Sequence, residues 1–216
     1  MARPVVEVFD SAREAAQEAA DAIANGLRDA ALERGRATFI ATGGKTPETT
    51  YDILASADLP WDNVTVTLTD ERWVDPHGAE SNERMVRDRL LTDRAASATF
   101  VPLKSAHAAL HEAIDEVETR LARILPADVT LLGMGEDGHI ASLFPHGRVE
   151  AEGLVVAAQA AQPRLSLTLE ALEPRRLTVL LISGEAKRRA LEEGSNLPIH
   201  AFLARTKAPV RILWSP

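Results

Sequence analysis

The sequence predicts a three-layer α/β/α protein with a mostly parallel central sheet, in a Rossmann-like arrangement. Short apolar runs rich in strand-forming residues alternate with amphipathic segments of helical periodicity along the chain. Apolar strands separated by amphipathic helices are typical of a parallel sheet that helices cover on both faces. We find no internal repeat, low-complexity tract or linker, so we expect a single domain over residues 1–216.

The first half of the chain begins with a predicted strand over 5–9 and a long helix. Ser11 is the expected N-cap of this helix, Glu14 occupies the capping-box position and Gly35 ends the helix. Its apolar face is formed by residues that recur every four positions: Ala15, Ala19, Ile23, Leu27 and Ala31.

The remaining elements follow the same alternation. Pro47 suits the first position of a helix that reaches about residue 54. The other predicted helices cover 83–91, 106–125 and 185–193. The other predicted strands cover 37–41, 64–69, 129–132, 154–158, 166–169, 177–182 and 210–213.

Composition excludes several classes of function. A formal net charge of −8 argues against nucleic acid or an anionic membrane as a partner. The chain has no cysteine, which excludes disulfides, thiol catalysis and cysteine-based zinc sites. The segment Met1–Val5 lacks the apolar core of a signal peptide, and no apolar run has the length of a membrane span. We therefore expect a cytoplasmic protein.

Four polar clusters follow predicted strands. They are Thr42–Thr46, Asp70–Arg72, Gly133–His139 and Ser183–Lys187. In open parallel sheets the ligand crevice lies at the carboxyl ends of the strands. We therefore expect these clusters to meet and form a binding site.

The third cluster carries the most informative chemistry. His139 follows a glycine-rich turn, and an imidazole with Asp137 two residues before it suits a general base near neutral pH. An ordinary polar histidine in a tight turn is the alternative. Gly133, Gly135 and Gly138 also match the dinucleotide fingerprint G-x-G-x-x-G. That fingerprint needs a helix opening on its third glycine and an acidic residue about 20 positions later, and the sequence indicates neither.

The other clusters offer anion-binding groups. The turn before Pro47 presents backbone N–H groups and hydroxyls suited to a phosphate or sugar oxygen; its residues are Gly43, Gly44, Lys45 and Thr46. A structural turn is the alternative, and the absence of a Walker sequence argues against ATP.

Arg72, beside Asp70, carries a guanidinium that can bind a phosphate in bidentate fashion, unless this charged segment is a solvated loop. Lys187 and Arg164 could bind the same anion as further cations. Alternatively, Lys187 is a surface lysine and Arg164 only flanks a strand. His107 and His111 have the four-residue spacing of a zincin pair without its glutamate, so we expect no metal site.

Three motifs in this order resemble the 6-phosphogluconolactonase family. They are Gly43-Gly44-x-Thr46-Pro47, then Asp70-Glu71-Arg72-x-Val74 with Ser81-Asn82, then the long motif from Gly133 through His139 to Pro145. The chain departs from the family pattern at Lys45, where serine is frequent, and at Ile140, where threonine is frequent. The resemblance implies a fold like that of glucosamine-6-phosphate deaminase.

The resemblance also implies an enzyme without a cofactor, which hydrolyses 6-phospho-D-glucono-1,5-lactone to 6-phospho-D-gluconate in the oxidative pentose phosphate pathway. His139 would activate water, Asp137 would position the loop or the imidazole, and backbone N–H groups of a glycine turn would meet the oxyanion. Arg72 and Lys187 would hold the phosphate. We expect a small sugar phosphate as partner, no nucleic acid or membrane, and a monomer or weak homo-oligomer.

Two alternatives stay open. The deaminase motif resembles Asp-Gly-His-Ile-Ala-Phe-Asn-Glu-Pro, and Phe144 occupies the position of its glutamate here. Losing that carboxylate argues against deaminase chemistry more than Ile140 argues for it. A non-catalytic sugar-phosphate sensor is the other alternative; it should lack the base, and it usually carries an added DNA-binding domain that this sequence does not indicate.

Overall fold

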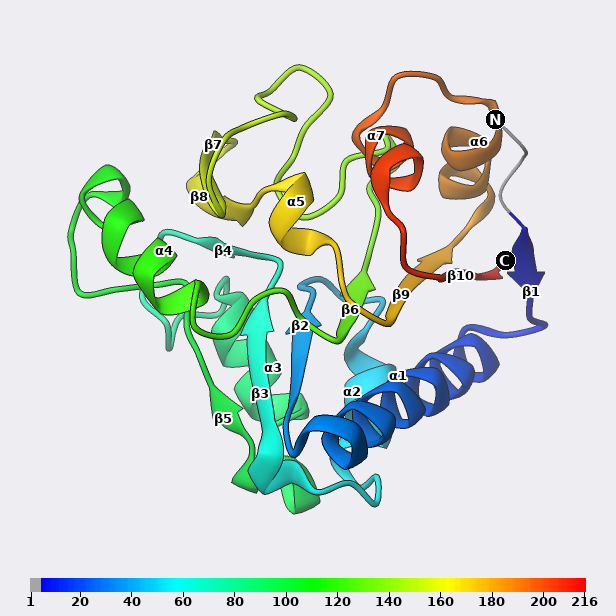
Figure 1. Ribbon diagram of the computed structural model, residues 1–216. Helices are drawn as coiled ribbons and strands as arrows, with labels where there is room; N and C mark the ends of the chain where they lie inside the picture. The colour runs from blue at the N-terminus through cyan, green and yellow to red at the C-terminus, as the bar shows by residue number, and fades with distance from the viewer. Residues whose placement is uncertain (1–4) are drawn as a thin grey trace.

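A seven-stranded parallel sheet runs through the centre of the computed structural model, which describes residues 5–216 (Figure 1). Most of the segment considered for a signal peptide, residues 1–4, therefore lies outside the described residues. The strand order is β1-β10-β9-β6-β2-β3-β5. These strands are β1 (Val6–Val8), β2 (Ala37–Ala41), β3 (Val64–Leu68), β5 (Thr99–Phe100), β6 (Val129–Leu132), β9 (Leu177–Ser183) and β10 (Val210–Ser215). The predicted α/β fold with a mostly parallel sheet is confirmed.

Helices lie on both sides of this sheet. In Figure 1, α1 and α2 lie on one side, and α6 and α7 lie on the other. The helices are α1 (Ala12–Arg34), α2 (Glu48–Ala55), α3 (Asn82–Arg89), α4 (Ile114–Leu121), α5 (Leu169–Leu172), α6 (Glu185–Glu193) and α7 (Pro198–Arg205). Among residues 5–216, no helix combines the length and the apolar character needed to cross a membrane.

The long helix α1 forms as its sequence predicts. The side chain of Ser11 accepts the N–H of Glu14 at 3.2 Å, and Gly35 ends the helix with a φ of 70°. The five predicted face residues are all buried. The Glu14 carboxylate accepts the N–H of Asp10, rather than that of Ser11, so the capping box closes one residue early.

A second, three-stranded antiparallel sheet corrects the prediction for two strands. It consists of β4 (Asp70–Arg72), β8 (Pro163–Leu167) and β7 (Val155–Gln159), in this order. The segments predicted as strands over 154–158 and 166–169 belong here, not to the parallel sheet. Only residues 160–162 join β7 to β8, and so short a connection permits antiparallel pairing alone.

Two other predictions were wrong in detail, and one helix was missed. The helix predicted over 106–125 forms only as α4, because Ser105 accepts the N–H of His107 and a separate 3₁₀ turn occupies Leu110–Glu112. The strand predicted to reach residue 169 ends earlier, since Thr168 caps α5 through the N–H of Ala171. Helix α7 was not predicted.

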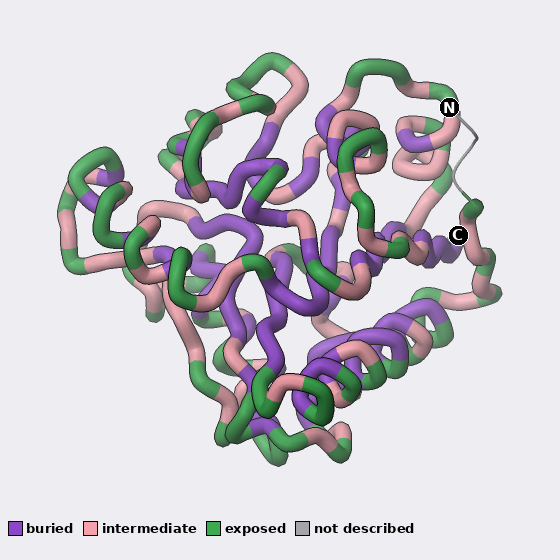
Figure 2. The backbone as a smooth tube through the Cα atoms, viewed as in Figure 1, coloured by how far each residue is buried: buried purple, intermediate pink, exposed green. Residues whose placement is uncertain are grey.

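The core lies along the central strands. Figure 2 shows the tube buried through the middle of the molecule and exposed mainly at its outer loops and helix faces. Phe39, Val66 and Leu131, from three neighbouring strands, are each 0% exposed. Burial of apolar surface stabilises the fold by about 25 cal/mol per Å². The buried core therefore holds in place the strands whose ends carry the polar clusters.

Candidate active site

A cavity of about 250 Å³ opens where the four polar clusters meet. Its lining includes nine of the ten residues singled out from the sequence: Gly43, Gly44, Lys45, Thr46, Asp70, Arg72, His139, Arg164 and Lys187. The tenth, Asp137, lies next to this lining and contacts His139. The segments that follow β2 and β6 and the first turn of α6, which follows β9, meet here, as expected for the carboxyl ends of parallel strands. Strands β4 and β8 of the antiparallel sheet complete the lining.

The turn after β6 orients the histidine. The N–H of Gly135 donates to the His139 carbonyl at 2.9 Å, and the N–H of Gly138 donates to the Gly135 carbonyl at 3.0 Å. Gly138 has a φ of 76°, in the region that favours glycine. No helix begins at Gly138, so this turn differs from the dinucleotide-binding turn.

Gly135 leaves the space that the imidazole occupies. A Cβ atom at Gly135 would lie 2.2 Å from His139 Nδ1 and 2.7 Å from Asp137 Oδ1. Contacts this short cannot be accommodated without moving the ring. The second glycine of the motif is therefore needed for close packing of the histidine.

Asp137 and His139 form a tight pair. His139 Nδ1 lies 2.6 Å from Asp137 Oδ1, and the His139 ring packs against Phe144 with a centroid distance of 4.9 Å. Partial burial acts to raise the pKa of Asp137, but the hydrogen bonds from His139 outweigh it and hold this pKa below its ordinary value. The carboxylate is thus ionised at neutral pH and accepts Nδ1–H. In the neutral ring, Nε2 then remains unprotonated and can accept a proton.

The turn after β2 presents unused backbone donors. Within residues 5–216, no hydrogen bond occupies the N–H groups from Gly43 to Thr46. Gly44 has a φ of 92°, and the turn leads into α2. The buried Tyr51 hydroxyl anchors the preceding residue, since it donates to the Thr42 carbonyl at 2.7 Å and accepts the Thr42 N–H at 2.8 Å. The turn is therefore a rigid anion-binding candidate.

Two arginines face each other across the small sheet. Arg72 of β4 and Arg164 of β8 are direct cross-strand partners. Like charges in this position repel each other, so a bound anion would stabilise the pair. Arg72 donates to the Glu80 carbonyl at 2.5 Å, and Arg164 lies 3.8 Å from the Asp70 carboxylate. The buried Nε of Arg164 has no partner in the described part of the chain.

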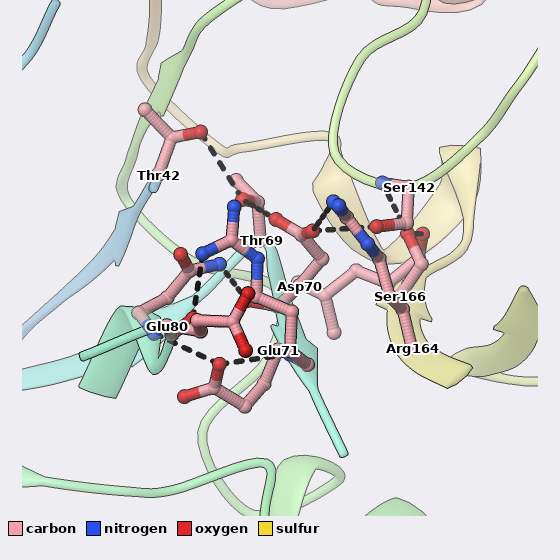
Figure 3. Close-up of polar contacts among 11 residues, drawn as sticks. Thr42, Thr69, Asp70, Glu71, Glu80, Ser142, Arg164 and Ser166 are labelled. Atoms are coloured by element: carbon pink, nitrogen blue, oxygen red, sulfur yellow. Dashed lines mark hydrogen bonds and ion pairs between the residues drawn. The ribbon is translucent and has the colours of Figure 1, made fainter. Parts of the chain in front are cut away.

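A buried polar network supports these groups (Figure 3). Asp70 is 4% exposed, and its carboxylate accepts the hydroxyls of Thr69 at 2.9 Å and Ser142 at 2.5 Å. The N–H of Ser142 donates to Ser166 Oγ at 3.1 Å. The network thereby joins the segment after His139 to β4 and β8. Because its groups are buried and paired, it resists displacement.

Glu71 has a structural role that the sequence did not indicate. Its carboxylate accepts four hydrogen bonds, from the N–H groups of Arg72, Asn82 and Glu83 and the hydroxyl of Ser81. Burial still raises the pKa of Glu71 above its ordinary value, although these bonds act to lower it. This carboxylate fastens the start of α3 to β4 and leaves Arg72 directed at the cavity.

Asn82 lines the cavity, although we did not single it out from the sequence. Its side chain donates to the Asp70 carbonyl at 2.9 Å, and a Cβ atom at Gly43 would lie 2.2 Å from its Oδ1. The Ser81-Asn82 pair in the second motif was the signal that could have indicated it. By contrast, His107 contacts Ser105 and Glu116 away from this cavity.

The cavity is more positive than the protein as a whole. It contains Lys45, Arg72, Arg164 and Lys187 but, of the carboxylates, only Asp70. Arg164 alone among these four cations has an ion pair within residues 5–216, to Asp70. A local positive excess on a chain of net charge −8 indicates an anionic ligand.

Known proteins are similar to this chain in sequence. The sequence model of the family described as glucosamine-6-phosphate isomerases/6-phosphogluconolactonase matches residues 10–214. A 6-phosphogluconolactonase of Caulobacter vibrioides is 41% identical over 97% of both chains. One of Rhizobium meliloti is 37% identical over 98% of both chains.

Solved structures agree. A 6-phosphogluconolactonase of Shewanella baltica has a TM-score of 0.93 and 35% identity, over 100% of this chain and 99% of its own. A monomeric glucosamine-6-phosphate deaminase has a TM-score of 0.83 at 22% identity, covering 98% of this chain and 97% of its own, which shows that the fold is common to both activities.

Proposed function

Because the chain belongs to the glucosamine-6-phosphate isomerase/6-phosphogluconolactonase family, we propose that it hydrolyses 6-phospho-D-glucono-1,5-lactone to 6-phospho-D-gluconate, in the oxidative pentose phosphate pathway. The observation that carries this proposal is the Asp137–His139 pair on a cavity lined by four cations. A lactone is an activated ester, so water and a general base suffice for its hydrolysis.

His139 acts as the general base. Its Nε2 accepts a proton from water while the water oxygen forms a bond to C1 of the lactone. The bond from C1 to the ring oxygen then breaks, and the protonated imidazole returns a proton to that oxygen, which becomes the C5 hydroxyl. Asp137 holds the ring through Nδ1–H and stabilises the imidazolium that forms.

The oxyanion at C1 needs a donor that is not already used. The N–H groups of Gly135 and Gly138 donate within their own loop. Within residues 5–216 no hydrogen bond occupies the N–H of Met134, which lies on the cavity wall. We assign this amide to the oxyanion. A donor aimed at the charge that develops in the transition state is typically worth about 3–4 kcal/mol.

The phosphate binds at the opposite end of the substrate. Arg72 and Lys187 hold it, and Arg164 and Lys45 add positive charge. The unused N–H groups from Gly43 to Thr46 donate hydrogen bonds to phosphate oxygens at the start of α2. Asp70 binds no anion itself but fixes Arg164 and Ser142. Binding energy at this end orients C1 over His139.

Deaminase activity is the less favoured alternative. Phe144 packs its ring against His139, at the position where the deaminase motif carries a glutamate. An aromatic ring there cannot relay protons. A non-catalytic sensor has no need of the oriented Asp137–His139 pair.

We further propose that residues 1–216 act as one domain in the cytoplasm, without a cofactor. Residues as far apart in sequence as Gly43 and Lys187 line one cavity, which supports a single functional unit. A small sugar phosphate is the partner that we propose for this cavity, and we propose a monomer or weak homo-oligomer.

Freshly generated lactone tests the function directly. The purified protein is mixed with the lactone, and acid release is followed above the spontaneous rate. Glucosamine 6-phosphate is assayed in parallel for ammonia release. Acid release without ammonia release is expected; the opposite pattern would favour the deaminase, and neither activity would favour the sensor.

A further inference from the structure

The turn that carries His139 is covered by the start of α7. The N–H of Ile199 donates to the Gly138 carbonyl at 3.1 Å. The side chain of Leu197 lies over Gly138, where a Cβ atom would come within 2.6 Å of Leu197 Cδ1. The residue directly before His139 is therefore held by a segment near the C-terminal end of the chain.

This contact resists displacement. The first amides of a helix lack partners inside the helix, and the Gly138 carbonyl supplies one for Ile199. Ile199 is 0% exposed and Gly138 is buried. Moving the turn away would leave a donor and an acceptor unpaired out of water, which is costly. The position of Gly138 thus depends on the position of α7.

Helix α7 is itself attached to α6 through a histidine. His200 Nε2 lies 2.9 Å from the Leu191 carbonyl, which can only accept, so Nε2 carries the proton. Leu191 belongs to α6, one turn after Lys187. A continuous segment therefore runs from the lysine on the cavity to the turn that carries the histidine.

We propose that Leu197 and His200 are positioning residues for His139. Leu197 holds the turn against the cavity, and His200 keeps α7 in register with α6. Through them the cation at Lys187 and the imidazole at His139 keep a fixed separation, which a substrate bound at both ends requires. This inference rests on the proposed function for its kinetic consequences, but the orientation of His139 can be observed without the lactone.

The first test compares Leu197→Ala with Leu203→Ala. Leu203 lies on the same α7 and packs against the core, so its truncation controls for loss of helix packing. We expect kcat for Leu197→Ala to fall about tenfold to a hundredfold, with the Kd of 6-phosphogluconate changed by less than about threefold. Leu197→Met, which covers Gly138 again, should restore most of the kcat. Equal kcat in the two alanine variants would overturn the role of Leu197.

The second test addresses His200. Glutamine can place an amide N–H where Nε2 donates, whereas leucine cannot, so His200→Gln should keep a kcat that His200→Leu loses. If both variants kept the wild-type kcat, the role of His200 would be refuted. Because His200→Leu retains Leu197, it also tests the coupling should Leu197→Ala fail to fold.

A readout without lactone separates this inference from the proposed function. The imidazole resonances of His139, assigned by comparison with His139→Ala, are recorded by NMR for each variant. Leu197→Ala and His200→Leu should shift them, whereas Leu203→Ala should not. Shifted resonances in a protein that does not turn over the lactone would refute the function and support the positioning role. Unshifted resonances in an active protein would refute the positioning role alone.

Discussion

Asp137 Oδ1 lies 2.6 Å from Nδ1 of His139 and also accepts the backbone N–H of His139 at 3.2 Å. One carboxylate oxygen therefore fixes both the ring and the backbone of the same residue. It selects the tautomer in which Nε2 is free to accept a proton. The turn, the tautomer and the direction of the base are thus set by residues two positions apart.

The His139→Ala variant should lose most lactonase activity and keep its fold. Loss of a positioned general base typically lowers kcat by about a hundredfold to ten-thousandfold. Product affinity, measured by calorimetry, should stay nearly unchanged, because the phosphate groups remain. The control is His146→Ala, which removes an exposed histidine just after the same motif. If His139→Ala kept the wild-type kcat, His139 would not be the general base.

The Asp137→Asn variant should change the pH dependence of stability. The folded pKa of Asp137 lies below its ordinary value, because the His139 hydrogen bonds outweigh burial. Such a group stabilises the fold above its unfolded pKa, and this contribution disappears as the pH falls through the folded pKa. The wild type should therefore be more stable than Asp137→Asn at neutral pH, and the difference should shrink below about pH 4.

Urea unfolding at a series of pH values measures this difference. Glu136→Gln removes a neighbouring exposed carboxylate that has no hydrogen bond in residues 5–216, and it is the matched control. The difference should be small, because half of the Asp137 side chain is exposed. If the difference in stability between wild type and Asp137→Asn grew as the pH fell, a lowered pKa of Asp137 in the folded protein would be contradicted.

Arg72→Ala and Lys187→Ala should each weaken recognition of the phosphate. A charge-assisted contact is worth about 1.5–3 kcal/mol, so kcat/KM for the phosphorylated lactone should fall about tenfold or more. The slow hydrolysis of unphosphorylated gluconolactone should barely change. The ratio of kcat/KM for the two substrates is the measurement, and an unchanged ratio would transfer the anchoring role to the turn from Thr42 to Thr46.

The Gly135→Ala variant should lose activity because its methyl group occupies the space of the imidazole. The added Cβ would lie 2.2 Å from His139 Nδ1, whereas one at Gly133 would meet only Thr42, at 3.9 Å. We expect kcat to fall about a hundredfold for Gly135→Ala, as for a misplaced catalytic group, and much less for Gly133→Ala. Equal losses in both variants would show that the contact with the imidazole is not the cause of the lost activity.

Chelation should leave turnover unchanged. Among residues 5–216, no group of three or more His, Asp or Glu side chains is arranged to hold a metal ion. The proposed mechanism draws its acid–base chemistry from His139 instead. The measurement is kcat after exhaustive dialysis against a chelator. Activity lost on chelation and restored by one specific divalent ion would overturn this mechanism.

Local sequence patterns determined the parallel sheet, α1 and the turn that carries His139. Ser11, Gly35 and the apolar periodicity between them specify α1 through contacts within a few residues. Likewise, apolar strands that end in polar clusters indicate a site at one edge of the sheet, because the carboxyl ends of parallel strands lie together. These features could be predicted because their causes are close in sequence.

Only the tertiary structure decided which distant groups support the site. Three contacts join segments that are far apart in sequence and share no repeating pattern. They are the hydrogen bonds around Glu71, the cross-strand pairing of Arg72 with Arg164 and the packing of Leu197 over Gly138. The same is true of the antiparallel sheet of β4, β8 and β7, which the alternation of strands and helices did not indicate. Hydrogen bonds and packing between distant segments depend on the folded arrangement of the backbone, and a single sequence does not encode that arrangement in any local pattern.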